Sequence, residues 1–451
     1  MIREPRRGLP SPAPRFALAN ASRAFRHRNY RLFFGSQLVS LVGTWMQSVA
    51  QAWLVLELSG DPFLLGLVAA MQFLPVSVLG LFGGLIADAL PKRRTLIATQ
   101  VTQMLLAFAL FGLVVSGLVE VWHIVVFAAL LGVSNAVDMP TRQAFVVEMV
   151  GRDDVANAVA LNSAVFNGAR IVGPAIAGLV IGAAGGDTSI AFLVNGLSFL
   201  AVIGGYALMR DEELNLPPLL ARPTSVADVR TTLAEGIRYV RRTDLVLLAT
   251  IVVGLASTFG MNFGVIIPAF AREVLHTDAT GYGFLMAASG IGSFSAAMLI
   301  AFSGRSQPAI IGGGALVLGL ALLVAAVVHA FAAALVAMAL VGMGAIAMAA
   351  TANTTIQLVV PDELRGRVIA VYTTVFVGST PLGGLLVGYV ASRFGVEASL
   401  AMSGVACVAV GVAGLAWLRR IRARAVSAAQ ARGEGAPAGV RAEVSSGRAG
   451  R

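Results

Sequence analysis

Charged side chains are scarce in this chain, and their scarcity excludes most classes of water-soluble protein. Only 12% of the 451 residues are Asp, Glu, Lys or Arg, whereas 57% are hydrophobic, and the mean hydropathy is +0.82. A soluble body of this size needs more polar surface. The net charge of +10 does not indicate nucleic-acid binding, because there is no soluble domain to do it and basic residues beside membrane spans face anionic headgroups.

Cysteine, histidine and lysine are also rare, and each shortage removes a kind of site. The single cysteine, Cys407, lies inside an apolar run, so a disulfide or a cysteine-rich metal site is excluded. The four histidines fall in loops or at span ends, so no intramembrane metal site or histidine proton relay is expected. Lys92 is the only lysine and Arg93 follows it, so the Gly-Lys-Ser/Thr of a nucleotide-binding loop is missing. We expect no metal, no cofactor and no catalytic residue, since a membrane-embedded enzyme needs such groups gathered at one depth.

The chain does contain a series of apolar stretches separated by polar gaps, and arginines crowd into every second gap. Because a spanning helix needs about 20 apolar residues, this pattern predicts an all-α membrane protein with twelve transmembrane helices. Basic loops stay in the cytoplasm, so we expect both termini inside and the chain, without a cleaved signal, in the cytoplasmic membrane. The predicted spans are 30–56, 62–87, 95–117, 121–140, 155–183, 188–209, 245–271, 279–302, 307–328, 330–352, 367–391 and 397–418.

The longest internal polar segment divides these spans into two sets of six. We expect an N-terminal six-helix bundle over 25–209, a cytoplasmic linker over 210–244 and a C-terminal six-helix bundle over 245–420. Apolar residues at helical spacing between Val226 and Val240 predict an amphipathic linker helix on the inner leaflet. Residues 1–24 and 421–451 lack periodicity, so both are expected to be disordered cytoplasmic segments.

The two halves carry the same glycine pattern. Three glycines step by five residues through the fifth span, and three more do so at the same place in the eleventh. The repetition indicates a duplicated unit, and two such halves typically enclose a central pathway. Small residues let helices approach closely and move past one another, and Pro174 predicts a kink. The six glycines are Gly168, Gly173, Gly178, Gly378, Gly383 and Gly388.

Polar side chains within the spans are candidates for a substrate cavity. An amide that faces lipid loses its hydrogen-bond partners, so the polar stripe of the first span must face a neighbouring helix or a wet cavity. Polar atoms can also hold helices together, and for a single Ser or Thr that is the favoured alternative. The candidate cavity residues are Thr44, Gln47, Gln51, Asn135, Thr258, Asn262, Phe263 and Asn353.

Arg170 lies near the middle of the fifth span, where a charge is costly. Its guanidinium stays protonated, so it needs a carboxylate, several carbonyls or water. The nearest plausible acid is Asp138, toward the inner end of the fourth span, although it is offset in depth. The alternative is that Arg170 snorkels toward the membrane surface or braces helices by binding carbonyls. Arg170, Asp138 and Asn167 are therefore the candidates for coupling transport to protons.

One segment resembles a known family signature. In residues 84–94 a glycine and an aspartate precede a basic cluster, as in the loop between the second and third spans of major facilitator superfamily transporters. The segment departs from the signature at Ala89, usually arginine, and at Pro91, usually glycine, which puts any gating contact at 89 in doubt. The residues that carry the resemblance are Gly84, Asp88, Lys92, Arg93 and Arg94.

Three further segments resemble the same superfamily. Residues 167–178 resemble its fifth-span antiporter motif, with one altered glycine spacing. Residues 138–142 and 361–368 resemble inner loops of the branch that contains enterobactin exporters and macrolide-efflux-like proteins. The resemblance covers roughly residues 25 to 420 and does not specify a substrate.

This resemblance implies a mechanism. Two six-helix bundles would rock about a central site lined by spans 1, 4, 7 and 10, which are the spans that carry the candidate cavity residues. Asp88 would brace the inner end of the eleventh span, with help from Arg365 or Arg367. We expect a secondary active transporter, a functional monomer in the lipid bilayer, that exports an amphipathic small molecule or drug in exchange for protons. Export of an enterobactin-like siderophore is the alternative; a non-transporting receptor or scaffold is another.

Overall fold

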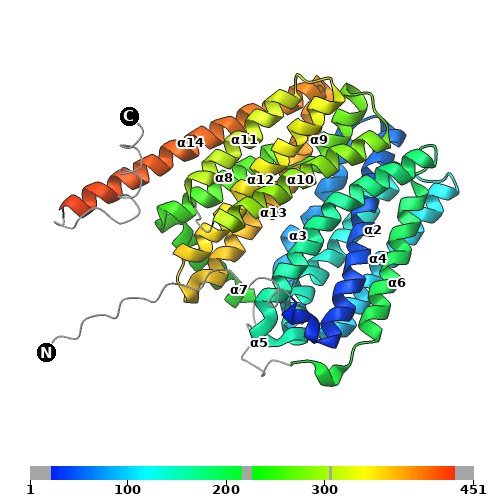
Figure 1. Cartoon of the computed structure of the whole chain (residues 1–451), viewed down its shortest axis with the longest axis horizontal. Coiled ribbons are helices and arrows are strands. Elements are labelled where there is room, and N and C mark those ends of the chain that lie inside the picture. The colour runs from blue at the N-terminus through cyan, green and yellow to red at the C-terminus, as the bar shows by residue number, and fades with distance from the viewer. Residues whose placement is uncertain (1–21, 216–225, 304–306, 432–451) are drawn as a thin grey trace.

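The structure is a computed structural model that describes residues 22–215, 226–303 and 307–431, without the side chains of 80–89, 226–232, 303, 425 and 428–431. Helices fill almost all of these ranges, in which no β-strand occurs. They form two groups side by side, an N-terminal half and a C-terminal half (Figure 1). Most of the two predicted disordered segments, 1–21 and 432–451, lies outside the described residues.

The N-terminal half contains five long helices after one short 3-10 helix. The bounds are η1 Arg23–Arg26, α2 Arg28–Ser59, α3 Pro62–Ala89, α4 Lys92–Val115, α5 Val121–Ala183 and α6 Ser189–Ala207. The run called α5 joins the fourth and fifth predicted spans. Its backbone leaves the helical region at Gly151, where φ is 70° and ψ is 176°. This left-handed conformation favours glycine, and it lets one helical run supply two spans.

The C-terminal half follows the linker, which contains η2 Asp211–Glu213 and α7 Val226–Arg242. Its own helices are α8 Asp244–Gly260, α9 Phe263–Ala269, the π-helix η3 Phe270–Val274, α10 Ala279–Ser303, α11 Ala309–Ala325, α12 Phe331–Val359, α13 Asp362–Phe394 and α14 Val396–Ala431. Two expectations need correction. The seventh span is broken at Met261 and Asn262 instead of being continuous, and α14 continues to Ala431, so the tail does not become irregular at 421.

The helices account for the twelve predicted spans. In the described part of the chain, ten are long and apolar enough to cross a membrane, by length and composition. One of these is α5, which holds two spans, and the shorter apolar helix α11 supplies the remaining one. The predicted turn at His329 lies between α11 and α12. The expected all-α fold with twelve transmembrane helices is therefore confirmed.

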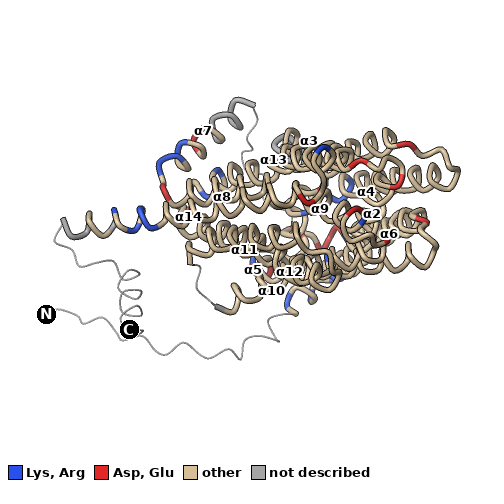
Figure 2. The backbone as a smooth tube through the Cα atoms, turned by 90° about the horizontal axis from the view of Figure 1, so that it is seen from above, with Lys and Arg blue, Asp and Glu red and all other residues tan. Residues whose placement is uncertain are grey.

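Basic residues gather at one end of the bundle. We call the end at which α2 and α4 begin and α14 finishes the basic end, and the end at which α2 meets α3 the opposite end. Figure 2 shows Lys and Arg on α7 and along the last turns of α14. The turn between α2 and α3, at the opposite end, has only the acids Glu57 and Asp61. The alternation of arginine-rich gaps in the sequence thus becomes a charge difference between the two ends.

The linker helix α7 is held by the C-terminal half. Arg367 of α13 forms an ion pair with Glu235 of α7. A Cβ atom added to Gly236 would lie only 2.7 Å from the carbonyl oxygen of Arg367, so the two backbones approach closely here. Val240, on the last turn of α7, is 4% exposed. These contacts fix α7 to α13.

Candidate functional site

The two halves contact each other mainly along two helix pairs, α3 with α13 and α5 with α10, with smaller contacts of α2 with α9 and α10 and of α3 with α9. Glycines make the closest approaches. A Cβ atom added to Gly178 of α5 would lie 2.8 Å from the carbonyl oxygen of Ala279 in α10, and one added to Gly388 of α13 would lie 2.9 Å from that of Pro62 in α3. Real Cβ atoms do not come this close, so these crossings require glycine as the halves now stand.

The two glycine series have matching surroundings. The first member of each series has no heavy atom of a neighbour within 4 Å of an added Cβ, the second meets the first helix of its own half, and the third meets the other half. The duplicated unit that the spacing indicates is therefore repeated in the packing. The series are Gly168, Gly173 and Gly178 in α5, and Gly378, Gly383 and Gly388 in α13.

The described contacts between the halves lie toward the opposite end. Along α5 they run from Gly182, which meets Thr280, to Ile171, which meets Gly290. One residue closer to the basic end, the Arg170 side chain donates a hydrogen bond of 2.8 Å to the Ser293 hydroxyl of α10. Along α3, the glycine contacts with α13 reach no further than Ala69. Arg170 therefore lies at the last described hydrogen bond between α5 and α10 before the basic end.

The surroundings of Arg170 differ from those that the sequence predicts. Its guanidinium carbon lies 5.9 Å from the centre of the Phe263 ring, and its Nη2 donates to Ser293. No carboxylate of the described residues lies within ion-pair distance. The predicted pairing with Asp138 is wrong, because Asp138 pairs with Arg142. The alternative, in which Arg170 braces helices by binding carbonyls, is met only in part: Arg170 does link α5 to α10, but through the Ser293 hydroxyl and not through a carbonyl. Asn167, one turn earlier, donates to the carbonyl of Ser163 on its own helix.

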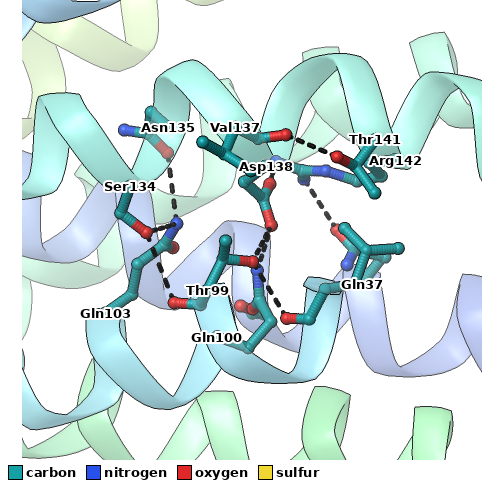
Figure 3. A network of polar contacts seen from close by, with 12 residues as sticks. Gln37, Thr99, Gln100, Gln103, Ser134, Asn135, Val137, Asp138, Thr141 and Arg142 are labelled. Atoms are coloured by element: carbon teal, nitrogen blue, oxygen red, sulfur yellow. Dashed lines mark hydrogen bonds and ion pairs between the residues drawn. The ribbon is translucent and has the colours of Figure 1, made fainter. Parts of the chain in front are cut away.

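Asp138 is the centre of a buried network in the N-terminal half (Figure 3). The carboxylate is fully buried and forms an ion pair with Arg142, four residues later on the same face of α5. Thr99 and Gln100 of α4 donate to it at 2.8 and 2.9 Å. Arg142 also donates to the Gln37 side chain of α2 at 3.1 Å. The network therefore joins three helices: the Asp138 carboxylate of α5 holds α4, and its ion-pair partner Arg142 holds α2.

The network continues one turn earlier in α5, before Asp138. Gln103 of α4 donates to the Ser134 hydroxyl at 3.2 Å and to the Asn135 side chain at 3.3 Å. Asn135 is half-buried and was predicted as a cavity residue. Thr99, Gln100 and Gln103 are not among the residues predicted from the sequence. Their helical spacing in the third span could have indicated a polar helix face.

The basic cluster that resembles the superfamily signature binds within the N-terminal half. Lys92 pairs with Glu148 at 2.7 Å, and both side chains are largely buried. Arg93 pairs with Asp211 and donates to the carbonyls of Tyr206 and Ala207, the last carbonyls of α6. The cluster therefore fastens α4 to the middle of α5, just before the bend at Gly151, and to the end of α6.

The other members of the signature are less informative. Arg94 is exposed. The surroundings of Gly84 and the side chain of Asp88 lie outside the described part of the structure, so the brace expected from Asp88 stays a prediction. Its two expected helpers are engaged elsewhere: Arg365 pairs with Asp362, and Arg367 with the linker helix.

A second ionic cluster at the basic end was missed from the sequence. Asp154, 1% exposed, accepts from His27 at 2.9 Å and pairs with Arg26 at 2.7 Å and Arg23 at 3.2 Å. Asn157 accepts from the backbone of Ala24. The short helix η1 is thereby fixed to the beginning of the fifth span, just after the bend at Gly151. The arginines before the first span offered the signal, but their partner could not be chosen among several acids.

The polar stripe of the first span forms contacts within its own half. Gln47 accepts a hydrogen bond of 2.6 Å from Asn195 of α6, and Thr44 donates to the carbonyl of Ser40. Gln51 is 8% exposed. The role of these residues as cavity residues stays a prediction. The hydrogen bond of Gln47 joins α2 to α6, whereas that of Thr44 stays within α2.

The candidates in the seventh and tenth spans are also locally bonded. Asn262 is 4% exposed and donates to the carbonyl of Thr258 at 2.8 Å, which satisfies a backbone group left open where α8 ends. Thr258 donates to the carbonyl of Gly254, and Asn353 accepts from Gln357. Asn262 therefore stabilises the break in the seventh span in this conformation.

Aromatic and charged residues close the opposite end between the halves. The Trp53 ring of α2 stacks on Tyr282 of α10 with centroids 6.1 Å apart and planes 19° apart. Trp53 also donates to Glu57 at 2.7 Å, and Arg272 of η3 interacts electrostatically with Glu57. The Nη1 atom of Arg272 is buried without a hydrogen-bond partner in the described structure. These side chains form a contact that must separate if the opposite end opens.

We expect Trp53→Ala to loosen this closed end. The substitution removes both the ring stack and the hydrogen bond to Glu57, and an aromatic pair contributes roughly 1 kcal/mol beyond its buried area. A cysteine placed at Gln51, in a Cys407→Ala background, should then react about fivefold faster than in the protein with Trp53, when a maleimide is supplied on the membrane side that the opposite end faces. Trp122→Ala, at an exposed tryptophan, is the matched control; equal labelling in both variants would contradict the role of Trp53.

The repeated halves, the glycine crossings and the span count define a transporter of the major facilitator superfamily. The chain belongs to the family described as transmembrane secretion effector, whose profile matches residues 19–446.

Curated relatives are themselves transporters. The chain is 29% identical over 404 residues to the multidrug efflux pump Tap of Mycolicibacterium fortuitum, covering 87% of this chain and 96% of the pump. It is 27% identical to the Tap pump of Mycobacterium tuberculosis (strain ATCC 25618 / H37Rv), covering 84% and 91%. It is 24% identical to the staphyloferrin A transporter of Staphylococcus aureus (strain NCTC 8325 / PS 47), covering 84% and 94%. The predicted superfamily and branch are confirmed.

Solved structures agree on the fold. A bacterial homolog of the human lysosomal transporter Spinster, in an inward-facing and unoccupied conformation, aligns with a TM-score of 0.67 at 14% identity, covering 89% of this chain and 96% of that one. A peptide transporter in complex with sulfate aligns with a TM-score of 0.70 at 14% identity, covering 88% and 95%. At this identity the likeness concerns the fold alone.

Proposed function

We propose that this protein exports an amphipathic small molecule by alternating access, in exchange for protons. The observation that carries the proposal is the placement of the described contacts between the halves. Glycines and aromatic rings close the opposite end, whereas among the described side chains the hydrogen bonds between α5 and α10 end at Arg170. Alternating access requires two states, each with a central crevice open to one side of the membrane only. This arrangement fits the state in which the crevice opens at the basic end. The efflux pumps among the relatives support export as the direction.

The orientation in the membrane follows from the charges. The basic end carries the start of the first described helix, the finish of the last one and the arginine clusters, and basic residues in short loops stay in the cytoplasm. The crevice would thus open to the cytoplasm in this structure. We further propose a cytoplasmic-membrane location, a functional monomer and no catalytic activity, since a transport cycle of this kind requires no covalent chemistry.

Proton coupling is assigned to carboxylates at the ends of the pathway. Asp138 is buried in the N-terminal half, and Glu57 lies at the closed end beside Arg272. A carboxylate that exchanges its cationic partner for a proton can link proton movement to a change of conformation. Asp138 is the candidate from the sequence; Glu57 is a candidate that only the structure suggests.

The proposal predicts proton-driven uptake into inverted membrane vesicles. Vesicles that contain the protein should accumulate at least one compound of a drug panel when an inward-acid gradient is imposed, and a protonophore should abolish the accumulation. Vesicles without the protein are the control. Accumulation that persists with the protonophore would contradict proton coupling, and no accumulation of any compound would contradict export and favour a receptor or scaffold.

Siderophore export is the second candidate. The staphyloferrin A transporter, which aligns with 84% of this chain, is named for a siderophore cargo. Including iron-free siderophores in the same vesicle panel separates this alternative from drug export.

A further inference from the structure

Arg170 is a cation inside the bundle whose charge is not balanced by a neighbouring acid. Two other partly buried cations each have a carboxylate partner: Arg142 pairs with Asp138, and Lys92 with Glu148. Arg170 has a neutral hydroxyl and an aromatic ring. A charge held in this way is expensive in a membrane protein unless an anion or water reaches it.

The guanidinium has free binding capacity. It carries five N–H donors in a planar fork, and the one described hydrogen bond, to Ser293, uses a single Nη atom. The Arg170 residue is partly exposed, so the remaining donors are within reach of a ligand. The fork matches the two oxygens of a carboxylate or sulfonate.

The position of Arg170 joins both halves. The residue belongs to α5, Ser293 to α10 and Phe263 to α9, and the described hydrogen bonds between α5 and α10 end here. Phe263 offers an apolar surface beside the cation. A molecule with an acidic group and an apolar part would therefore contact the two halves at once, which is where a substrate can influence their movement.

We propose that Arg170 binds an anionic group of the cargo, and that the cargo is an organic anion with an apolar portion. This inference rests on the proposed transport function and specifies its substrate class. Asp138 does not compete for Arg170 in this state, because Arg142, Thr99 and Gln100 already hold its carboxylate. The guanidinium is thus free to distinguish a cargo by charge.

Matched ligand pairs test the proposal. The probes are dansyl derivatives of glycine, leucine and phenylalanine, each as the free acid and as the methyl ester, so that the members of a pair differ in one ionised carboxylate. Their fluorescence is titrated with the full-length protein in lipid nanodiscs at constant pH. For at least one pair, the wild type should bind the acid about tenfold more tightly than the ester, as expected for hydrogen bonds to a charged group.

Substitution of Arg170 should remove the preference without removing the pocket. In Arg170→Gln the acid and the ester should bind alike, with the ester affinity unchanged, and Arg170→Lys should keep part of the preference. Arg152→Gln, which removes an exposed arginine from the basic end, should behave as the wild type. If Arg170→Gln does not fold, the reduced preference in Arg170→Lys carries the test.

Two results would overturn the proposal: no acid preferred over its ester in the wild type, or a preference that survives in Arg170→Gln. Failure of the transport function is a different result. Vesicles that accumulate esters and acids equally retain the transporter and contradict only the anion site, whereas vesicles that accumulate no compound contradict the transporter itself.

Discussion

Replacing Gly388 by leucine should reduce transport by about tenfold or more while the protein still folds. The crossing of α13 and α3 leaves no room for a side chain, because an added Cβ would lie 2.9 Å from the carbonyl oxygen of Pro62 and 3.2 Å from the Cα atom of Phe63. Backbone atoms cannot yield as a flexible side chain can. The two halves must therefore separate at the opposite end, and the closed state is disfavoured; a tenfold shift in population needs only about 1.4 kcal/mol.

The loss would not come from a weaker helix. Leucine has a higher helix propensity than glycine by roughly 0.8 kcal/mol, so α13 itself should gain stability. Gly178→Leu in α5 should have the same effect as Gly388→Leu, since it occupies the matching position of the repeat and meets Ala279 of the other half. Equal loss at both positions would indicate that the two crossings act as one closure.

The measurement combines transport with labelling. A cysteine at Gln51 in the Cys407→Ala background should react faster from the opposite side in both glycine variants, because the closed end is held apart. Gly112→Leu, in α4 where an added Cβ meets nothing within 4 Å, is the control and should transport normally. Normal transport in Gly388→Leu, or slow labelling with lost transport, would contradict a closure formed by these glycines.

The span pattern was predictable because the membrane imposes it. A bilayer requires about 20 apolar residues per crossing and keeps basic loops on one side, so length and charge alone predict twelve helices. The glycine repeat was predictable for a related reason: close crossings admit only small residues, and a duplicated unit reproduces them. Both signals are local or periodic in the sequence.

The partners of the buried charges were not predictable. Sequence position gives the depth of a residue along its span but not the neighbour toward which its face is turned. Asp138 was matched with Arg170 from the scarcity of intramembrane charges, yet its partner is Arg142, on the next turn of the same helix. Arg142 had been assigned to a loop, because the predicted fourth span ended at residue 140, whereas the helix continues past Pro140.

The break in the seventh span depends on a contact between distant segments. The stretch near Asn262 is apolar enough to continue as a helix, and no proline lies at the break. In the structure, Gly383 of α13 lies against the carbonyl of Thr258 and the Asn262 side chain, and Asn262 satisfies a carbonyl that the break exposes. Such an interruption requires knowledge of which helix lies alongside, which a single sequence does not contain.

Replacing Asp138 by alanine should destabilise the protein by about 3–5 kcal/mol, the cost of leaving a buried charge without its partner. Arg142 would keep its Gln37 hydrogen bond but lose its counter-ion, while Thr99 and Gln100 would lose their acceptor. Thermal unfolding of the purified protein in detergent measures the change. Asp153→Ala, at an exposed neighbouring acid, is the control and should unfold as the wild type.

A charge-neutral pair separates the structural role of Asp138 from a coupling role. Asp138→Asn combined with Arg142→Gln removes both charges but keeps groups that can hydrogen-bond to each other, to Thr99 and to Gln37, so most of the lost stability should return. If Asp138 exchanges protons during transport, the folded double variant should still equilibrate the substrate across the membrane but no longer accumulate it against a gradient. Full accumulation by the double variant would make the network purely structural and would transfer the coupling role to Glu57, the carboxylate that accepts from Trp53 at the closed end.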